Sequence, residues 1–310
     1  MVPTGLEAAA ALARAALYLG LTLAAGVVTV DVLLRHQRRT GDASSDASGG
    51  RSLAWPATVG TMLLLVAPLA LLELQRVALE LSRAELSILL GETAWGPHWM
   101  QLAAAGVATA VVLGVMTWRA RAHPSPAYLR RDASMALLVI AGLGVVATAA
   151  AMSGLGHAAA DVEWPRLSRT ADSVHALAAA TWIGGLALTT WTWRGASGHK
   201  PAAAWAAFSR VATVAAPVVL LSGVISSWRR LGISDVTALV PMLGMPYGQL
   251  LAAKGAVVLV MLAIGARQRQ RIAAAKNTEL RAIGTELLFA LLVFGVTAVL
   301  TGTEPPAQRP

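Results

Sequence analysis

The sequence predicts an all-α fold, a polytopic bundle of about eight transmembrane helices. Of its 310 residues 56% are hydrophobic and only 13% are charged, and the mean hydropathy is +0.62. Soluble proteins carry roughly 25% charged residues, so these apolar residues do not fit a single soluble core. A helix needs about 20 apolar residues to cross the hydrocarbon layer, and stretches of that length recur along the chain between short charged loops.

These apolar stretches define one transmembrane domain over residues 1–310. The first lacks a basic segment before it and is too long for a signal peptide, so we expect a retained helix. The predicted spans cover about 8–34, 53–74, 98–118, 133–153, 172–193, 203–228, 247–266 and 285–301.

Two connecting segments have a distinct character. Residues 38–51 are small, polar and rich in glycine and serine, which is typical of a flexible loop. Residues 76–92 are too charged to cross a membrane, yet Val77, Leu81 and Ile88 fall on one helical face. We therefore expect an amphipathic helix at the membrane surface there.

The basic residues predict the orientation. Sixteen of the 25 lysines and arginines lie in or beside alternate loops, which the positive-inside rule assigns to the cytoplasm. Both termini are then extracytoplasmic, and residues 38–51 form a cytoplasmic loop. This asymmetry explains the net charge of +9 better than binding to nucleic acid does.

The residue types and motifs that the sequence lacks exclude several kinds of functional site. There is no cysteine, which excludes disulfides, thiolate metal sites and c-type haem attachment, so a metal would be held by His, Met, Asp or Glu. The sequence has no nucleotide-binding glycine loop and no nucleophile elbow, so we do not expect an enzyme. Transport would then be driven by a gradient or by a partner.

Three histidines are the candidate metal ligands. His98, His157 and His175 lie at the outer ends of the third, fourth and fifth spans, where an ionisable side chain is costly unless it has a role or a partner. The other three histidines lie in the cytoplasmic loops and are assigned no role; they are His36, His123 and His199.

His175 is the deepest of these candidates. Asp172 lies three residues earlier on the same helical face, where its carboxylate could accept the ring N–H and leave the other nitrogen for a metal. A buried histidine satisfied by Asp172 or by a backbone carbonyl, with no metal, is the open alternative.

Methionines near the outer ends could complete a copper site. Thioether and imidazole ligands suit copper, particularly the cuprous ion. Met152, five residues before His157, is the candidate ligand, and ordinary core packing is the alternative for every methionine. A possible outer relay consists of Met100, Met242 and Met245.

Buried charges and small residues predict helix contacts. We expect Glu73 to pair with Lys254 or Arg14, and Glu286 to pair with Arg210. Gly184 and Gly185 permit close helix approach, so the fifth span should be central.

The second half of the sequence resembles the copper resistance protein D (CopD) family. GHAAA at 156–160 and DSVHALAAATWIGGL at 172–186 are similar to that family's paired-histidine signature. FSRVA, SGVISSWRRLG, YGQLLAAKGAVVL and ELLFALLVFGVTAVLTGTEPP resemble the later helices of the family in the same order. The resemblance is clear from about Met152 onward.

The resemblance implies a protein of the bacterial inner membrane that transports copper, generally inward, or delivers it. It implies His157 and His175 as ligands at an extracytoplasmic site through which copper enters, and we expect Asp172 and Trp182 beside them. It also implies a separate extracytoplasmic copper-binding partner of the CopC type. Two alternatives stay open: electron transfer with haem b bound by paired histidines, and copper delivery to a respiratory oxidase.

Overall fold

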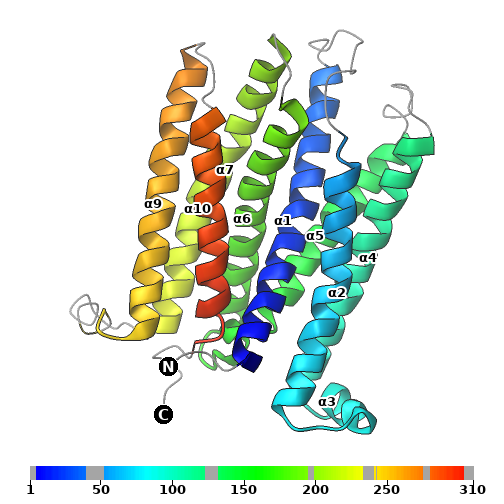
Figure 1. The fold of residues 1–310 in the computed structure, drawn as a ribbon, viewed down its shortest axis with the longest axis vertical. Helices are drawn as coiled ribbons and strands as arrows, with labels where there is room; N and C mark the ends of the chain where they lie inside the picture. Colours follow the sequence, from blue (N-terminus) through cyan, green and yellow to red (C-terminus); the bar gives the residue numbers. More distant parts are fainter. Residues whose placement is uncertain are drawn as a thin grey trace.

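The computed structural model describes residues 5–39, 52–122, 132–194, 199–232, 241, 243–274 and 280–303. Every regular element in these ranges is a helix, so the predicted all-α class is confirmed (Figure 1). Three short elements lie in the connections: η1 (Arg83–Glu85), α3 (Leu86–Gly91) and η3 (His157–Ala160). The long helices are α1 (Gly5–Arg39), α2 (Ala54–Ala78), α4 (Trp95–Ala122), α5 (Asp132–Ser153), α6 (Pro165–Trp193), α7 (His199–Leu231), α9 (Pro246–Ala273) and α10 (Leu280–Leu300).

The long helices make the chain a multi-pass membrane protein. Six of them, α1, α2, α4, α5, α7 and α9, are long and apolar enough to cross a membrane. Helices α6 and α10 are not among the six. Helix α6 contains threonine, serine and tryptophan among its apolar residues, and the apolar part of α10, Gly284–Leu300, is shorter. Whether α6 and α10 also cross the membrane, as the prediction of eight spans requires, stays a prediction.

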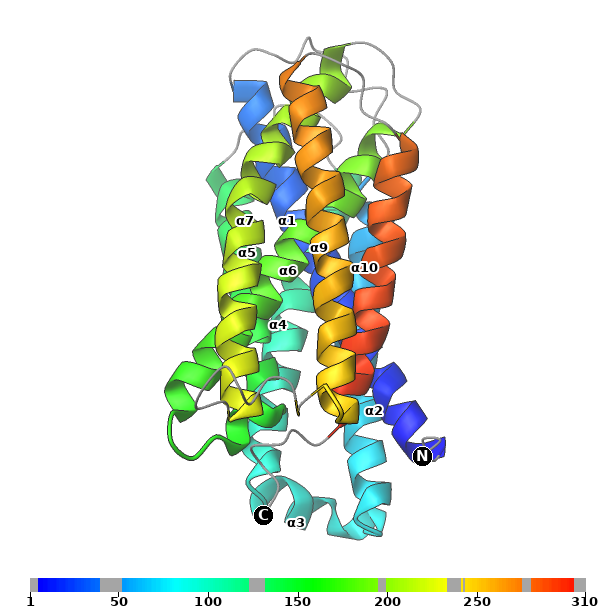
Figure 2. The ribbon, with the colours of Figure 1, turned by 90° about the vertical axis from the view of Figure 1, so that its left-hand side faces the viewer.

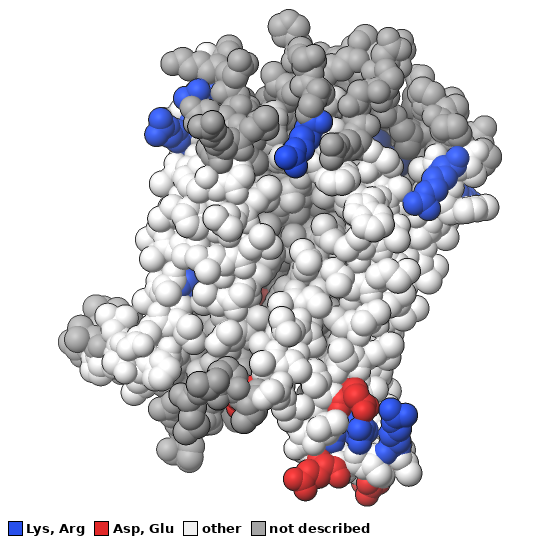
Figure 3. All heavy atoms as spheres, viewed as in Figure 1, with Lys and Arg blue, Asp and Glu red and all other residues white. Residues whose placement is uncertain are grey.

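The two ends of the bundle differ in charge. The ends of α1, α4, α6 and α9 that lead into the connections predicted to be cytoplasmic lie at one end of the bundle, and the start of α1, the end of α10 and α3 lie at the other (Figures 1 and 2). Among the described charged side chains on the face shown in Figure 3, those at the first of these ends are basic, whereas basic and acidic side chains mix at the second. This distribution fits the predicted orientation, which the structure itself does not establish. Most of the loop predicted at 38–51 falls outside the described residues.

The segment after α2 is divided, where we expected one surface helix over 76–92. Helix α2 runs on to Ala78, and Glu80 then takes a left-handed conformation with φ 55°. Ser82 and Glu85 form a capping box that starts a new helical turn. A backbone that leaves the helical region at Glu80 cannot continue α2, so α3 is a separate short helix. Its position at the membrane surface remains a prediction.

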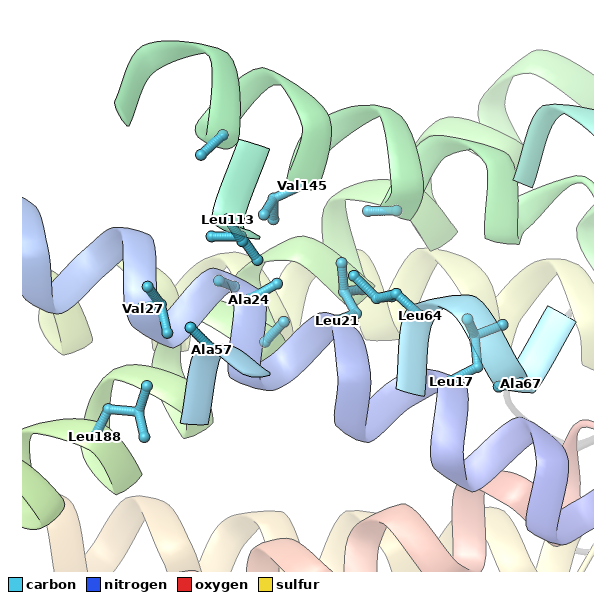
Figure 4. Close-up of a cluster of buried hydrophobic side chains, with 14 of the residues drawn as sticks. Leu17, Leu21, Ala24, Val27, Ala57, Leu64, Ala67, Leu113, Val145 and Leu188 are labelled. Carbon is cyan, nitrogen blue, oxygen red and sulfur yellow. The ribbon is translucent and has the colours of Figure 1, made fainter. Parts of the chain in front are cut away.

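The bundle consists of two groups of four helices joined along α1 and α6. Helices α1, α2, α4 and α5 form the first half; α6, α7, α9 and α10 form the second. Figure 4 shows the leucines, alanines and valines at the centre of the first half, to which α6 also contributes. The second half has its own apolar cluster, which includes Trp182, Phe208 and Met261.

The joint between the halves depends on glycine. Gly184 of α6 crosses α1 so closely that an added Cβ would lie 2.0 Å from the carbonyl oxygen of Thr22. A Cβ on Gly26 of α1 would in turn lie 2.6 Å from the carbonyl carbon of Gly184. Neither position can hold a side chain, because backbone atoms occupy the space. The predicted close approach at Gly184 and the central place of α6 are therefore confirmed.

Candidate functional site

His175 projects from α6 toward α7. Its Nδ1 lies 3.0 Å from the carbonyl oxygen of Val219 and 3.2 Å from the hydroxyl oxygen of Ser222. A carbonyl can only accept, so Nδ1 of the neutral ring carries the hydrogen and Nε2 keeps its lone pair. Gly223 makes room for the ring, since a Cβ there would lie 3.1 Å from Cε1. The ring is thus fixed in the tautomer that a metal ligand needs, with Nε2 available.

Contrary to our prediction, Asp172 does not accept the ring N–H of His175. Its carboxylate accepts a hydrogen bond of 2.6 Å from the hydroxyl of Ser226 and forms an ion pair with Arg230. A guanidinium is a stronger partner for a carboxylate than a neutral imidazole N–H, because the attraction is between two charges. The tautomer is therefore set by a carbonyl of α7, and Asp172 instead ties α6 to the C-terminal end of α7.

Around this ion pair lies a group of polar residues that we call the outer polar cluster, because the sequence predicts that this end of the bundle is extracytoplasmic: Asp172, His175, Arg230, Tyr247 and Lys254. His175 interacts electrostatically with Lys254, Asp172 and Arg230, which come from three helices. Lys254 makes no hydrogen bond or ion pair with any described residue. Tyr247 is buried, and its hydroxyl lies beside Arg230 without a well-formed hydrogen bond to a described residue. The outer polar cluster therefore contains two cationic side chains, Arg230 and Lys254, and one carboxylate, Asp172.

Sequence reasoning missed the residues of α7 in this site, although a signal was present. Ser222, Ser226 and Arg230 follow one another at intervals of four, which places them on one face of a helix. Such a stripe on an otherwise apolar helix indicates a polar surface inside the bundle, since polar groups facing lipid are costly. The stripe is the face that α7 turns toward Asp172 and His175.

The loop that follows His157 is anchored to α7 by charge. Asp161 accepts two hydrogen bonds from the guanidinium of Arg229, at 2.8 and 2.9 Å, and it also accepts bonds from the Ser168 hydroxyl and the Trp164 N–H. These contacts, chiefly those from Arg229, hold the pKa of the Asp161 carboxyl well below its usual range. The loop between η3 and α6 is therefore held against the C-terminal end of α7.

His157 is described only through its backbone, in the first position of η3. Its side chain lies outside the described residues, so whether it meets His175 stays a prediction. His98, at the start of α4, packs against Gly154, three residues before His157; a Cβ on Gly154 would lie 2.8 Å from Nδ1 of His98. That Nδ1 is buried and has no hydrogen-bond partner among the described residues. His98 thus lies against the turn that leads to His157.

The other predicted site residues are dispersed. Met152 packs against the apolar core of the first half, and Trp182 is buried in that of the second, two helical turns from His175. Met100 is 45% exposed, Met245 precedes α9, and Met242 lies outside the described residues. Within the described ranges no group of three or more His, Asp and Glu residues is placed to hold a metal ion.

The predicted pairings of buried charges are wrong. Glu73 pairs with Arg76, one turn away on α2, because a partner on the same helix needs no tertiary approach. Arg14 instead donates to the carbonyl of Ala298 on α10, at 3.4 Å. Arg210 is exposed, and Glu286 is buried without it.

One comparison with known proteins gives a result. Residues 202–300, which cover nearly all of α7 and the whole of α9 and α10, match the family model described as copper resistance protein D, CopD. No curated protein and no solved structure matches the chain.

Proposed function

We propose, from the CopD family domain that residues 202–300 constitute, that this protein moves copper across the bacterial inner membrane or delivers it there, with His175 as a ligand near the extracytoplasmic end. The orientation of the His175 ring carries the proposal. Its N–H is donated to Val219, so Nε2 is the atom left for copper. Copper handling follows from the family; inward movement and the histidine site are our inference.

The rest of the ligand set comes from the turn around His157. Imidazole binds copper well, and a chain without thiolates has to rely on imidazole and thioether groups. We propose His157 as the second ligand, held near α7 through Asp161 and Arg229. His98 lies against the same turn and is the third candidate. Met152 packs into the apolar core and is the least supported of the four ligands that we predicted.

The positive charge of the outer polar cluster bears on how copper arrives. Arg230 and Lys254 would repel free cupric ions more strongly than cuprous ions, because Coulomb energy scales with ionic charge. A cuprous ion handed over by an extracytoplasmic copper-binding protein of the CopC type would meet less repulsion. We therefore propose Cu(I) as the cargo and a separate donor chain as the partner.

Copper uptake into vesicles tests the proposal. Right-side-out vesicles with the full-length chain would be compared with vesicles that carry His175→Ala. His36→Ala is the matched control, since His36 is exposed near the C-terminal end of α1, away from the proposed site. We expect uptake to be lost in His175→Ala and kept in His36→Ala. Unchanged uptake in His175→Ala would remove the assigned site. Copper binding without any uptake by the wild-type chain would favour delivery to a respiratory oxidase.

A haem site is the second candidate, because a histidine whose N–H is held by a carbonyl is also a suitable axial ligand for haem. An absorption spectrum of the purified protein separates the two candidates. A Soret band that disappears in His175→Ala would establish haem binding and overturn the copper assignment.

A further inference from the structure

Glu286 is a buried carboxylate for which the described residues provide no partner. It lies in the second turn of α10 and is 5% exposed; among the described residues, none makes a hydrogen bond to its Oε1 and none forms an ion pair with it. Helices α9 and α10 lie side by side (Figures 1 and 2), and a Cβ on Gly265 of α9 would lie 3.6 Å from Oε1. The carboxyl thus faces α9 where that helix has no side chain.

The charged groups of the neighbouring helices are directed elsewhere. On α9, Arg267 and Arg269 are exposed, Arg271 has interactions of its own, and the buried residue of this region is the uncharged Gln268. On α1, Asp31 pairs with Arg35, which also donates to Ser134 of α5.

Two further basic residues lie directly after α6 or on α10 itself. Arg194, which follows α6, is exposed. Arg281, on α10 itself, precedes Glu286 by five residues, off the spacing of three or four that brings helical side chains together, and its side chain is outside the described set. No described cation is therefore placed to balance a charge on Glu286.

We infer that Glu286 is a proton-binding site of the bundle. An ionised carboxylate in an apolar interior is costly unless it is paired, and the carboxyl group avoids that cost by binding a proton. The group lies about 9 Å from the start of α10 along the helix axis, at the end with the predicted cytoplasmic loops. Helix α6 places His175 toward the opposite end of the bundle.

The inference deepens the proposed function, on which its second step rests. When the O–H bond of Glu286 breaks, its proton passes to water at the cytoplasmic end and the carboxylate keeps one negative charge. A cuprous ion that passes at that moment balances this charge. Once the ion has passed, the carboxylate takes up a proton again from the water at the same end. One proton would thus leave and return for each cuprous ion that passes, so the rate of copper movement would be coupled to the pH at this end.

Infrared spectroscopy tests the proton site without reference to copper. The full-length chain in lipid nanodiscs at neutral pH should show the C=O stretching band of a protonated carboxylic acid, which shifts in D₂O. The band should be lost in Glu286→Gln and kept in Glu92→Gln, whose glutamate is exposed outside the long helices. An acid band of equal size in wild type and Glu286→Gln would overturn the proton site.

Copper uptake at several pH values tests the coupling. In the wild type the uptake rate should depend on pH; in Glu286→Gln, which resembles the neutral acid, copper should still bind with wild-type stoichiometry but uptake should lose this dependence. Glu286→Asp should restore it. An unchanged pH profile in Glu286→Gln would overturn the coupling and leave the copper site standing. A wild-type chain that neither binds nor moves copper would sink the proposed function, while the infrared band would still decide the proton site.

Discussion

The two halves of the bundle use buried polar groups differently. Among the described residues of the first half, the charged pair inside the bundle is Asp31–Arg35, near the end of α1, and Thr109 and Thr148 meet at its centre with a hydrogen bond of 3.1 Å. In the second half, by contrast, charged and titratable groups lie within the helical layer; they are Asp172, His175, Arg230, Lys254 and Glu286.

This difference indicates that the first half provides rigid packing and the second half carries the functional groups. Each buried charge in a membrane protein opposes stability, so a half that carries five such groups needs a rigid neighbour or a function that retains them. The first half supplies the neighbour, because its core of interlocking leucine and alanine packs directly against α6 (Figure 4). The segment that matches the CopD model lies wholly in the second half. The chemistry and the family match thus fall on the same side of the joint.

The largest predicted effect comes from separating the halves at their joint. In Gly184→Leu the new Cβ would lie 2.0 Å from the Thr22 carbonyl oxygen, so α1 and α6 have to move apart. Overpacking usually costs about 1–3 kcal/mol, and a backbone clash that no rotamer relieves should exceed that range. We expect little folded protein, measured as the monodisperse fraction after detergent extraction.

Gly114→Leu is the matched control for this substitution. It places the same side chain on α4 at a glycine whose added Cβ would have no atom within 4 Å. We expect wild-type yield from Gly114→Leu. Equal yields from the two variants would mean that the halves are not held together at Gly184.

A smaller effect is predicted at the ion pair between Asp161 and Arg229, where charge and not packing holds the loop before α6 in place. Asp161→Asn removes the carboxylate that receives two hydrogen bonds from Arg229 and should lower the stability of the outer loop by about 2 kcal/mol at neutral pH. The pKa of Asp161 is lowered in the folded state, so its stabilisation is complete above the ordinary pKa of 3.8 and is lost as the pH falls below it. Thermal unfolding in detergent should therefore show a gap between wild type and variant at pH 5–7 that narrows only in stronger acid.

Glu163→Gln serves as the comparison for Asp161→Asn. Its carboxylate also contacts Arg229, at 3.1 Å, but its side chain is 75% exposed, so its loss should cost less than about 1 kcal/mol. If Asp161→Asn were no more destabilising than Glu163→Gln, the anchoring of the loop by a partly buried ion pair would be wrong.

The sequence predicts the long helices and their close crossing better than it predicts the polar contacts. Each predicted apolar stretch coincides with one long helix, although helix ends lie up to seven residues from its ends, and Gly184 correctly marks the close crossing. The acceptor for His175 is a backbone carbonyl, the alternative that the sequence left open. Its position on Val219 was not predictable, since any residue type on another helix supplies a carbonyl. Spacing along α6 suggested Asp172, but a guanidinium from α7 outcompetes a neutral ring for that carboxylate.

The smallest predicted effect concerns the polar contact at the centre of the first half. Thr109→Val keeps the shape of the side chain and removes the hydroxyl that meets Thr148. Each threonine hydroxyl also lies within hydrogen-bond distance of a carbonyl of its own helix, so one of the two has to turn its single hydrogen away from that carbonyl to donate across the contact. Hydrogen bonds between membrane helices average about 0.6 kcal/mol, so the loss of stability should be of that order. Copper binding should be unchanged, because Thr109 lies about three helical turns from His98 on α4, and neither His157 nor His175 belongs to the four helices of this half. A clear loss of copper binding in a stable Thr109→Val protein would show that the two halves do not divide packing and chemistry between them.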